Sequence, residues 1–413
     1  MAPRPTTDQS LSPALLPIQA LIEAEQQDFT EGADGRKRAG YFCAYTPPEV
    51  LNAAGLRHAR LFKAGSPEIV SQGERYTQSV FCDFSKSCIG GFDPEGGDPF
   101  YRAVDKLYTF HTCASMKRAT EVIERFVPTK LLNLPRLRGE PASRAFFREE
   151  IAHYRDDVAE LAGRPVTDDE ITAQIVLYNK VRALLRRFSE LRKGVNPPLT
   201  GRDFLELVRG FYYVPPEKLL DVYGKLYRKL SRVRDNGARP VRLMISGSIM
   251  ADGDRRLVEL IEQEIGARVV VEDHCTGLKP FAHTLPEEGD PFQALADGYL
   301  DQAPCARMKP LDDSLDFSAR LAEEYAVDGV VYVYLKFCAC YGVSKLEFIE
   351  RLQSRGIPVL EISSDYSQSD HGQLKTRLEA FIEVLQDRRT DLALSRAASG
   401  QPTGTNTGEF AHG

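Results

Sequence analysis

The run Gly-Val-Val-Tyr-Val-Tyr-Leu at residues 329–335 is the clearest strand signal in the chain. Its β-branched and aromatic residues favour a strand, and such a continuous apolar run is typical of a strand buried on both faces of a parallel sheet. Segments with helical periodicity lie on either side of it, at 318–325 and 346–352. The run therefore predicts a parallel sheet covered by helices.

The same alternation of strand and helix extends outward from this run. It predicts a second α/β domain at 240–390, with further strands at 241–245, 267–271 and 357–362 and further helices at 255–265 and 374–385. The residues that follow, 391–413, are rich in Ser, Gly and Thr and read as a disordered tail.

The first part of the chain has a similar but weaker alternation. We expect a first α/β domain at 37–140, with strands ending near Phe42, Phe62 and Phe110. Long charged segments with helical periodicity follow at 141–239 and predict a helical linking segment, while residues 1–36 predict an N-terminal helix and arm. The predicted fold class is α/β: two Rossmann-like or flavodoxin-like parallel-sheet domains joined by a helical segment.

Composition narrows the class of protein. The 413 residues carry 53 basic and 59 acidic side chains, a formal charge of −6, so no excess of basic side chains favours nucleic acid as a partner. No apolar run approaches the roughly 18 residues of a membrane span, and the N-terminus does not resemble a signal peptide. We therefore expect a cytoplasmic protein with no membrane or nucleic-acid partner.

Six of the eight cysteines fall after predicted strands or in a loop of the second half. In parallel α/β sheets the carboxyl ends of the strands form the crevice that binds ligands, so thiols from both halves are expected to converge there. A single cysteine at such a place is usually a packing residue, but six together make that explanation weaker. The six are Cys43, Cys82, Cys113, Cys275, Cys305 and Cys338.

The spacing of these cysteines excludes the common metal motifs. The chain contains no Cys-x-x-Cys pair, as a structural zinc site would have, and neither ferredoxin spacing. What remains is a cluster held by isolated thiolates from distant loops. The phenylalanines beside the thiols, Phe42, Phe81, Phe110 and Phe337, could shield such a cluster from water or could be ordinary core residues. The P-loop motif is also absent, so the chain does not supply its own ATPase.

Several segments, in order, resemble the 2-hydroxyacyl-CoA dehydratase and benzoyl-CoA reductase superfamily, over about residues 37–387. The segments that carry the resemblance are Gly40-Tyr41-Phe42-Cys43-Ala44-Tyr45-Thr46-Pro47-Pro48-Glu49, His111-Thr112-Cys113-Ala114-Ser115-Met116, Asn196-Pro197-Pro198-Leu199-Thr200-Gly201, Asp328-Gly329-Val330-Val331 with Lys336-Phe337-Cys338, and Glu361-Ile362-Ser363-Ser364-Asp365-Tyr366-Ser367 with Gly372-Gln373-Leu374.

The resemblance implies an iron–sulfur subunit of an enzyme of anaerobic metabolism. In such proteins three cysteines bind a [4Fe–4S] cluster, and the matching positions here are Cys82, Cys113 and Cys338. The implied partners are a homologous second subunit, an ATP-hydrolysing activator that delivers a low-potential electron, and an acyl-CoA substrate. The chemistry would be either that of a lyase, ketyl-radical dehydration, or that of an oxidoreductase, aryl-CoA reduction. No individual catalytic residue is implied.

A second branch of the superfamily is also similar. The double-cubane cluster reductases are single-chain proteins thought to form homodimers, and all six cysteines, Cys43, Cys275 and Cys305 included, match cysteines there. That resemblance implies a double-cubane 8Fe–9S cluster. A third hypothesis, from a different class, is a paralogue without a cluster in which the thiols only pack. Cys88 and Cys340 lie outside the six-cysteine pattern, as packing residues or as neighbours of the ligands.

Overall fold

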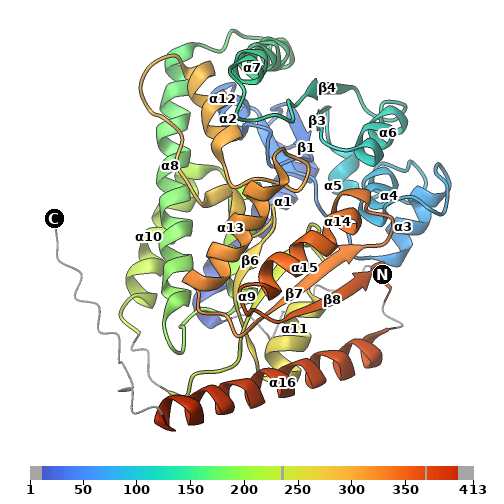
Figure 1. The fold of residues 1–413 in the computed structure, drawn as a ribbon. Coiled ribbons are helices and arrows are strands. Elements are labelled where there is room, and N and C mark those ends of the chain that lie inside the picture. Colours follow the sequence, from blue (N-terminus) through green and yellow to red (C-terminus); the bar gives the residue numbers. More distant parts are fainter. Residues whose placement is uncertain (1–11, 234–236, 368–369, 399–413) are drawn as a thin grey trace.

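The computed structural model describes residues 12–233, 237–367 and 370–398 (Figure 1). It contains two separate four-stranded parallel sheets, which confirms the predicted fold class. The first sheet has the strand order β2-β1-β3-β4, and the second has β6-β5-β7-β8. The two orders are the same, and both follow the flavodoxin-like pattern rather than the Rossmann pattern.

The first sheet lies within residues 38–133. Its strands are β1 (Arg38–Tyr41), β2 (Arg57–Arg60), β3 (Lys106–His111) and β4 (Thr129–Asn133). The helices of this half are α1 (Leu16–Glu31), α2 (Pro48–Ala53), α3 (Pro67–Glu74), α4 (Asp83–Gly91), α5 (Pro99–Arg102) and α6 (Ala114–Ile123). β4 was not predicted, because only Leu132 of its residues is buried and the strand lies at the sheet edge.

The second sheet lies within residues 242–364. Its strands are β5 (Arg242–Gly247), β6 (Arg268–Asp273), β7 (Gly329–Leu335) and β8 (Val359–Ser364). The helices of this half are α11 (Arg256–Glu259), a π-helical turn (Leu260–Ile265), α12 (Pro291–Asp301), α13 (Leu311–Glu324), α14 (Ala339–Val343), α15 (Lys345–Gln353) and α16 (His371–Ala398). The strand predicted at 329–335 has the bounds of β7.

Helix α16 is longer than predicted. It packs Leu378, Ile382 and Leu385 against the second sheet and lies across the base of the molecule in Figure 1. The expected tail at 391–413 is therefore wrong for residues 391–398, which continue the helix because Leu, Ala and Arg favour it and neither glycine nor proline occurs between Gly372 and Gly400. Residues 399–413 lie outside the described residues.

Four helices connect the halves: α7 (Pro141–Ala162), α8 (Asp168–Glu190), α9 (Gly201–Tyr213) and α10 (Pro216–Leu230). A capping box of Thr167 and Glu170 begins α8. This segment contacts both halves of the chain through buried ion pairs, since Arg182 on α8 bonds to Glu49 on α2. Just after α8, Arg192 donates a 2.9 Å hydrogen bond to Glu272 on β6. No helix in the described parts of the chain has the length and apolarity needed to cross a membrane.

Candidate metal centre

The carboxyl ends of the two sheets face each other. Arg60, the last residue of β2, donates hydrogen bonds to the carbonyl oxygen and the sulfur of Cys275, which follows β6. In each sheet the strand order reverses at its centre, between β1 and β3 and between β5 and β7. Ligands of open parallel sheets bind at such points, so two binding positions are brought together here.

Four of the six predicted thiols follow a strand, as expected. Cys43 follows β1 and Cys275 follows β6. Cys113 follows β3 and is the N-cap residue of α6, where its sulfur accepts a hydrogen bond from the backbone N–H of Met116 at 3.5 Å. Cys338 follows β7 and is the N-cap residue of α14. Cys305 lies in the loop between α12 and α13, which is also as predicted.

Cys82 does not follow a strand, so that prediction was wrong. Ser79, Val80 and Phe81 form an exposed turn between α3 and α4 and are not part of the first sheet, which consists of β1 to β4. Cys82 instead caps the N-terminus of α4. The loop nevertheless delivers it to the same place as Cys113 and Cys338.

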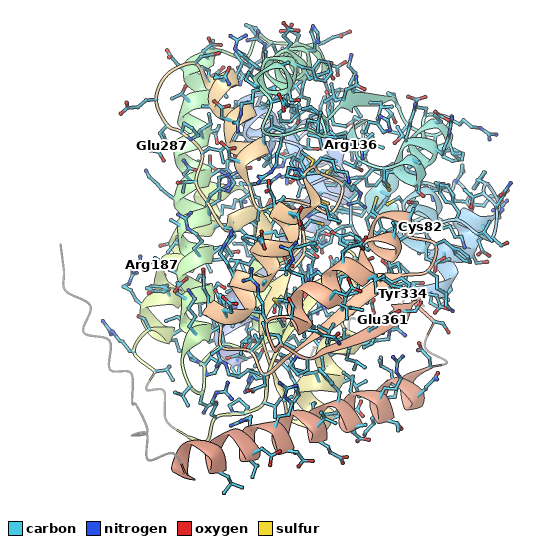
Figure 2. The ribbon with its side chains drawn as sticks, viewed as in Figure 1. Cys82, Arg136, Arg187, Glu287, Tyr334 and Glu361 are labelled. Carbon is cyan, nitrogen blue, oxygen red and sulfur yellow. The ribbon has the colours of Figure 1, made fainter. Side chains whose placement is uncertain are left out.

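One cavity of about 380 Å³ is lined by Cys82, Cys113 and Cys338, together with Cys340 from the first turn of α14. We call Cys82, Cys113, Cys338 and Cys340 the cavity thiols. Cys82 and Arg136, both labelled in Figure 2, line the cavity from the first half of the chain. Ser248, Arg307 and Cys338 line it from the second half. The cavity therefore lies between the two sheets and is built by both.

The cavity thiols interact in two pairs. A hydrogen bond from Cys340 holds the pKa of Cys113 below its usual range, and the pKa of Cys340 is raised in return. Cys82 and Cys338 form the second pair, in which the pKa of Cys338 is lowered and that of Cys82 is raised. In each pair the hydrogen bond lowers the pKa of the thiol that accepts it and raises that of the thiol that donates it, so the two thiols titrate as a unit.

The remaining three of the six predicted thiols form a second group that we call the inner thiols: Cys43, Cys275 and Cys305. Cys43 accepts a 3.5 Å hydrogen bond from the backbone N–H of Tyr45, and burial raises its pKa to about 12. Cys275 accepts a 3.0 Å hydrogen bond from Arg60. Cys305 accepts one of 3.2 Å from Arg307. Two of the three inner thiols are therefore held by arginines.

Arg307 lies between the two thiol groups. It bonds to Cys305, whose negative charge raises the pKa of its guanidinium against the effect of burial, and it also interacts with Cys113. Its Nε is buried and has no hydrogen-bond partner among the described residues. The sequence did not single out Arg307, because its only nearby signal is Cys305 two residues earlier and its other partners come from distant segments.

The aromatic residues proposed as a shield do not take that position. None of Phe42, Phe81, Phe110 and Phe337 lines the cavity. Phe42 and Phe110 are buried in the core, and Phe337 is 51% exposed. Phe84, on the first turn of α4, lines the cavity instead.

The donor set fits a cluster better than a single metal ion. Within the described ranges, no three Cys, His, Asp or Glu side chains lie close enough together to hold one ion. The cavity thiols are instead spread around a space much larger than an ion. Thiolates are the ligands that iron–sulfur clusters use, and an iron–sulfur cluster would fill such a space.

Comparisons with known proteins match nearly the whole chain. The family described as 2-hydroxyglutaryl-CoA dehydratase, D-component, has a model that matches residues 43–385. A protein of Escherichia coli (strain K12), provisionally named dehydratase subunit YjiM, is 32% identical, with 88% of this chain and 96% of the relative covered. The beta subunit of (R)-phenyllactyl-CoA dehydratase from Clostridium sporogenes is 23% identical, with 85% and 92% covered. One of the benzoyl-CoA reductase subunits of Thauera aromatica is 24% identical with the same coverage.

Proposed function

Because the chain belongs to the 2-hydroxyglutaryl-CoA dehydratase D-component family, we propose that it is the iron–sulfur subunit of an enzyme acting on a CoA thioester. The enzyme would take a low-potential electron from an ATP-hydrolysing activator and use it for ketyl-radical dehydration or for aryl-CoA reduction. A homologous second subunit would complete the enzyme. The cytoplasmic location expected from the sequence stays a prediction.

One observation carries this proposal: Cys82, Cys113 and Cys338 line a single cavity although they come from distant segments. These are the three positions that the family resemblance implies as ligands. They reach the cavity from α4, α6 and α14, and each is the N-cap residue of its helix. The pKa values of Cys113 and Cys338 are lowered, first of all by hydrogen bonds from Cys340 and Cys82, and this favours the thiolate form that binds iron.

The other cavity residues can bind and orient a thioester. When bound, the cluster would supply an electron at low potential. Arg136 and Arg307 place two positive charges on the cavity wall. His111 also lines the cavity, and burial together with the charge of Arg136 lowers its pKa, so its imidazole is neutral at pH 7. A neutral imidazole donates one hydrogen bond, and a thioester oxygen could accept it.

Anaerobic purification followed by metal analysis tests the proposal. We expect about four irons per chain, as one [4Fe–4S] cluster requires. C82A, C113A and C338A should each lose most of the iron, whereas C88A, which replaces a buried cysteine outside the cavity, should keep it. A colourless, air-stable protein with less than about one iron, unchanged by C113A, would instead support the paralogue without a cluster.

A second candidate function is the double-cubane reductase acting as a homodimer. The observation that favours it is the position of the inner thiols, which lie next to the cavity thiols and are connected to them through Arg307. Six thiolates could hold two linked cubanes. This candidate predicts about eight irons per chain and loss of about half of them in C275A and C305A, whereas the single-cubane protein would keep its iron in both variants.

A further inference from the structure

The cavity contains a fourth thiol in addition to the three implied by the family resemblance. Cys340 lies in the first turn of α14, two residues after Cys338, and lines the same cavity as Cys82, Cys113 and Cys338. Cys113, which comes from the other half of the chain, lines the same cavity from the start of α6. Cys340 therefore belongs to the set of thiols that surrounds the cavity.

The comparison with Cys88 shows that this placement is not what packing alone produces. Both cysteines lie outside the six-cysteine pattern. Cys88 is fully buried in the middle of α4 and does not line the cavity, so it behaves as a small apolar core residue. Cys340 is only partly buried and lines the cavity together with Cys113, Cys338 and Arg307. Its surroundings are those of a ligand.

The charge on the cavity wall also suits several thiolates. Arg136 and Arg307 line the cavity together with the four cavity thiols. Positive charge at this position reduces the mutual repulsion of neighbouring thiolates.

We propose that Cys340 is a fourth thiolate ligand, so that the resting cluster of this chain is held by Cys82, Cys113, Cys338 and Cys340. This proposal rests on the proposed function, because it assumes that a [4Fe–4S] cluster occupies the cavity. It implies that no iron of the resting cluster is open to a small ligand from solution. Any substrate that binds iron directly must first displace Cys340.

Cyanide binding, followed by EPR spectroscopy of the dithionite-reduced protein, tests this assignment. Cyanide binds an iron that lacks a protein ligand, and its binding shifts the EPR spectrum. We expect the spectrum of the wild-type protein to be unchanged by cyanide. C340A, which frees one iron, should show a spectrum that differs from wild type and shifts further with cyanide until it saturates. C88A is the matched control and should behave as wild type.

Each outcome decides the proposal. A wild-type spectrum that shifts with cyanide, or a C340A spectrum identical to wild type in both conditions, would overturn it. If C340A is folded by circular dichroism but has lost its iron, C340S provides the second variant, since serine oxygen is a weaker ligand of similar size. A C340S protein with restored iron and an altered spectrum supports ligation, and one with the wild-type spectrum refutes it. Absence of iron from the wild-type protein would refute the proposed function itself, which is a separate result.

Discussion

Arg307 donates a hydrogen bond from Nη1 to the sulfur of Cys305 at 3.2 Å, and the same guanidinium interacts with Cys113 among the cavity thiols. Burial alone would raise the pKa of Cys305, but the positive charge of Arg307 lowers it overall. One arginine thus contributes to lowering the pKa of a thiol in each group, and this relationship can be tested without any metal.

We expect R307M to raise the pKa of both Cys305 and Cys113, because it removes the charge that favours their thiolate forms. In the metal-free protein at pH 7, iodoacetamide should then alkylate both residues more slowly, as followed by peptide mass spectrometry, since only the thiolate reacts. R307K keeps the charge and should retain most of the wild-type rate. Equal rates in R307M and wild type would show that the arginine does not control these thiols.

Gly247, at the end of β5, allows the backbone of β5 to lie close to that of β7. The part of the cavity wall that the second half supplies depends on this contact. The φ of Gly247 is +114°, and an added Cβ would lie 2.0 Å from the carbonyl oxygen of Val333. The next residue, Ser248, accepts a 3.1 Å hydrogen bond from Leu335, just before the loop of Cys338. We expect G247A to lower the free energy of unfolding by more than about 2 kcal/mol, through both backbone strain and steric overlap.

Urea unfolding measures this effect, and G356A is its matched control. Gly356 also has a positive φ, but an added Cβ would meet no atom within 4 Å. G356A should therefore show only the conformational cost of about 1 kcal/mol. Similar losses in the two variants would mean that the contact with Val333 has little energetic weight. Iron content should fall in G247A and stay unchanged in G356A if the displaced wall carries Cys338 with it.

The sequence predicted the elements whose signal is local. Val330, Val331 and Val333 mark β7 as a buried central strand, and periodicity on both sides of it predicted the helices that cover the sheet. The strand-end positions of Cys43, Cys113, Cys275 and Cys338 followed from those strands. Their convergence followed in turn from a general property of parallel sheets, namely that ligands bind at the carboxyl ends of the strands.

The features that sequence reasoning missed depend on contacts between distant segments. Arg307 interacts with Cys113, which is almost two hundred residues earlier, and nothing near Arg307 in sequence indicates this. The turn at Ser79-Val80-Phe81 looks like a short strand because Val and Phe favour strands, but strand formation also needs a neighbour to pair with. Cys340 was noted as an extra cysteine, and only the structure places it beside the other cavity thiols.

Phe337, immediately before Cys338, combines backbone strain with exposure. Its φ is +60° although it has a bulky side chain, and the ring is 51% exposed. F337G removes both the ring and the strain, whereas F337A removes only the ring. We expect F337G to be more stable than F337A by about 1 kcal/mol in urea unfolding, because glycine adopts positive φ without steric cost. Equal stability would mean that the local backbone relaxes in F337A.

F337G and F337A also show whether reduction of the protein depends on the backbone strain at residue 337 or on a surface contact of the ring. Strained, exposed residues next to a site persist where they have a role, and here the ring stands on the surface beside a proposed cluster ligand. We expect the proposed activator to reduce F337G and F337A more slowly than wild type and to a similar extent, because both lack the ring. Reduction at the wild-type rate in F337G alone would show that backbone geometry, rather than ring contact, matters there.

His58 on β2 makes the stability of the protein depend on pH. Its Nε2 lies 3.1 Å from the hydroxyl of Tyr178, and its Nδ1 is buried without a partner among the described residues. Burial, with a smaller effect from the charge of Arg36, lowers its pKa from 6.5 to about 4. His58 is therefore protonated near pH 6.5 in the unfolded chain, but only near pH 4 in the folded protein. Stability is complete above pH 6.5 and is lost as the pH falls towards 4.

Comparison of wild type with H58Q measures this contribution, because glutamine can still bond to Tyr178 but does not titrate. Between pH 7 and pH 5 the wild-type free energy of unfolding should fall by about 2 kcal/mol more than that of H58Q, as one proton per chain implies. H153Q, at an exposed histidine on α7, should follow the wild-type curve. Parallel curves for wild type and H58Q would show that His58 is protonated in the folded protein as easily as in the unfolded chain, which requires water to reach its Nδ1.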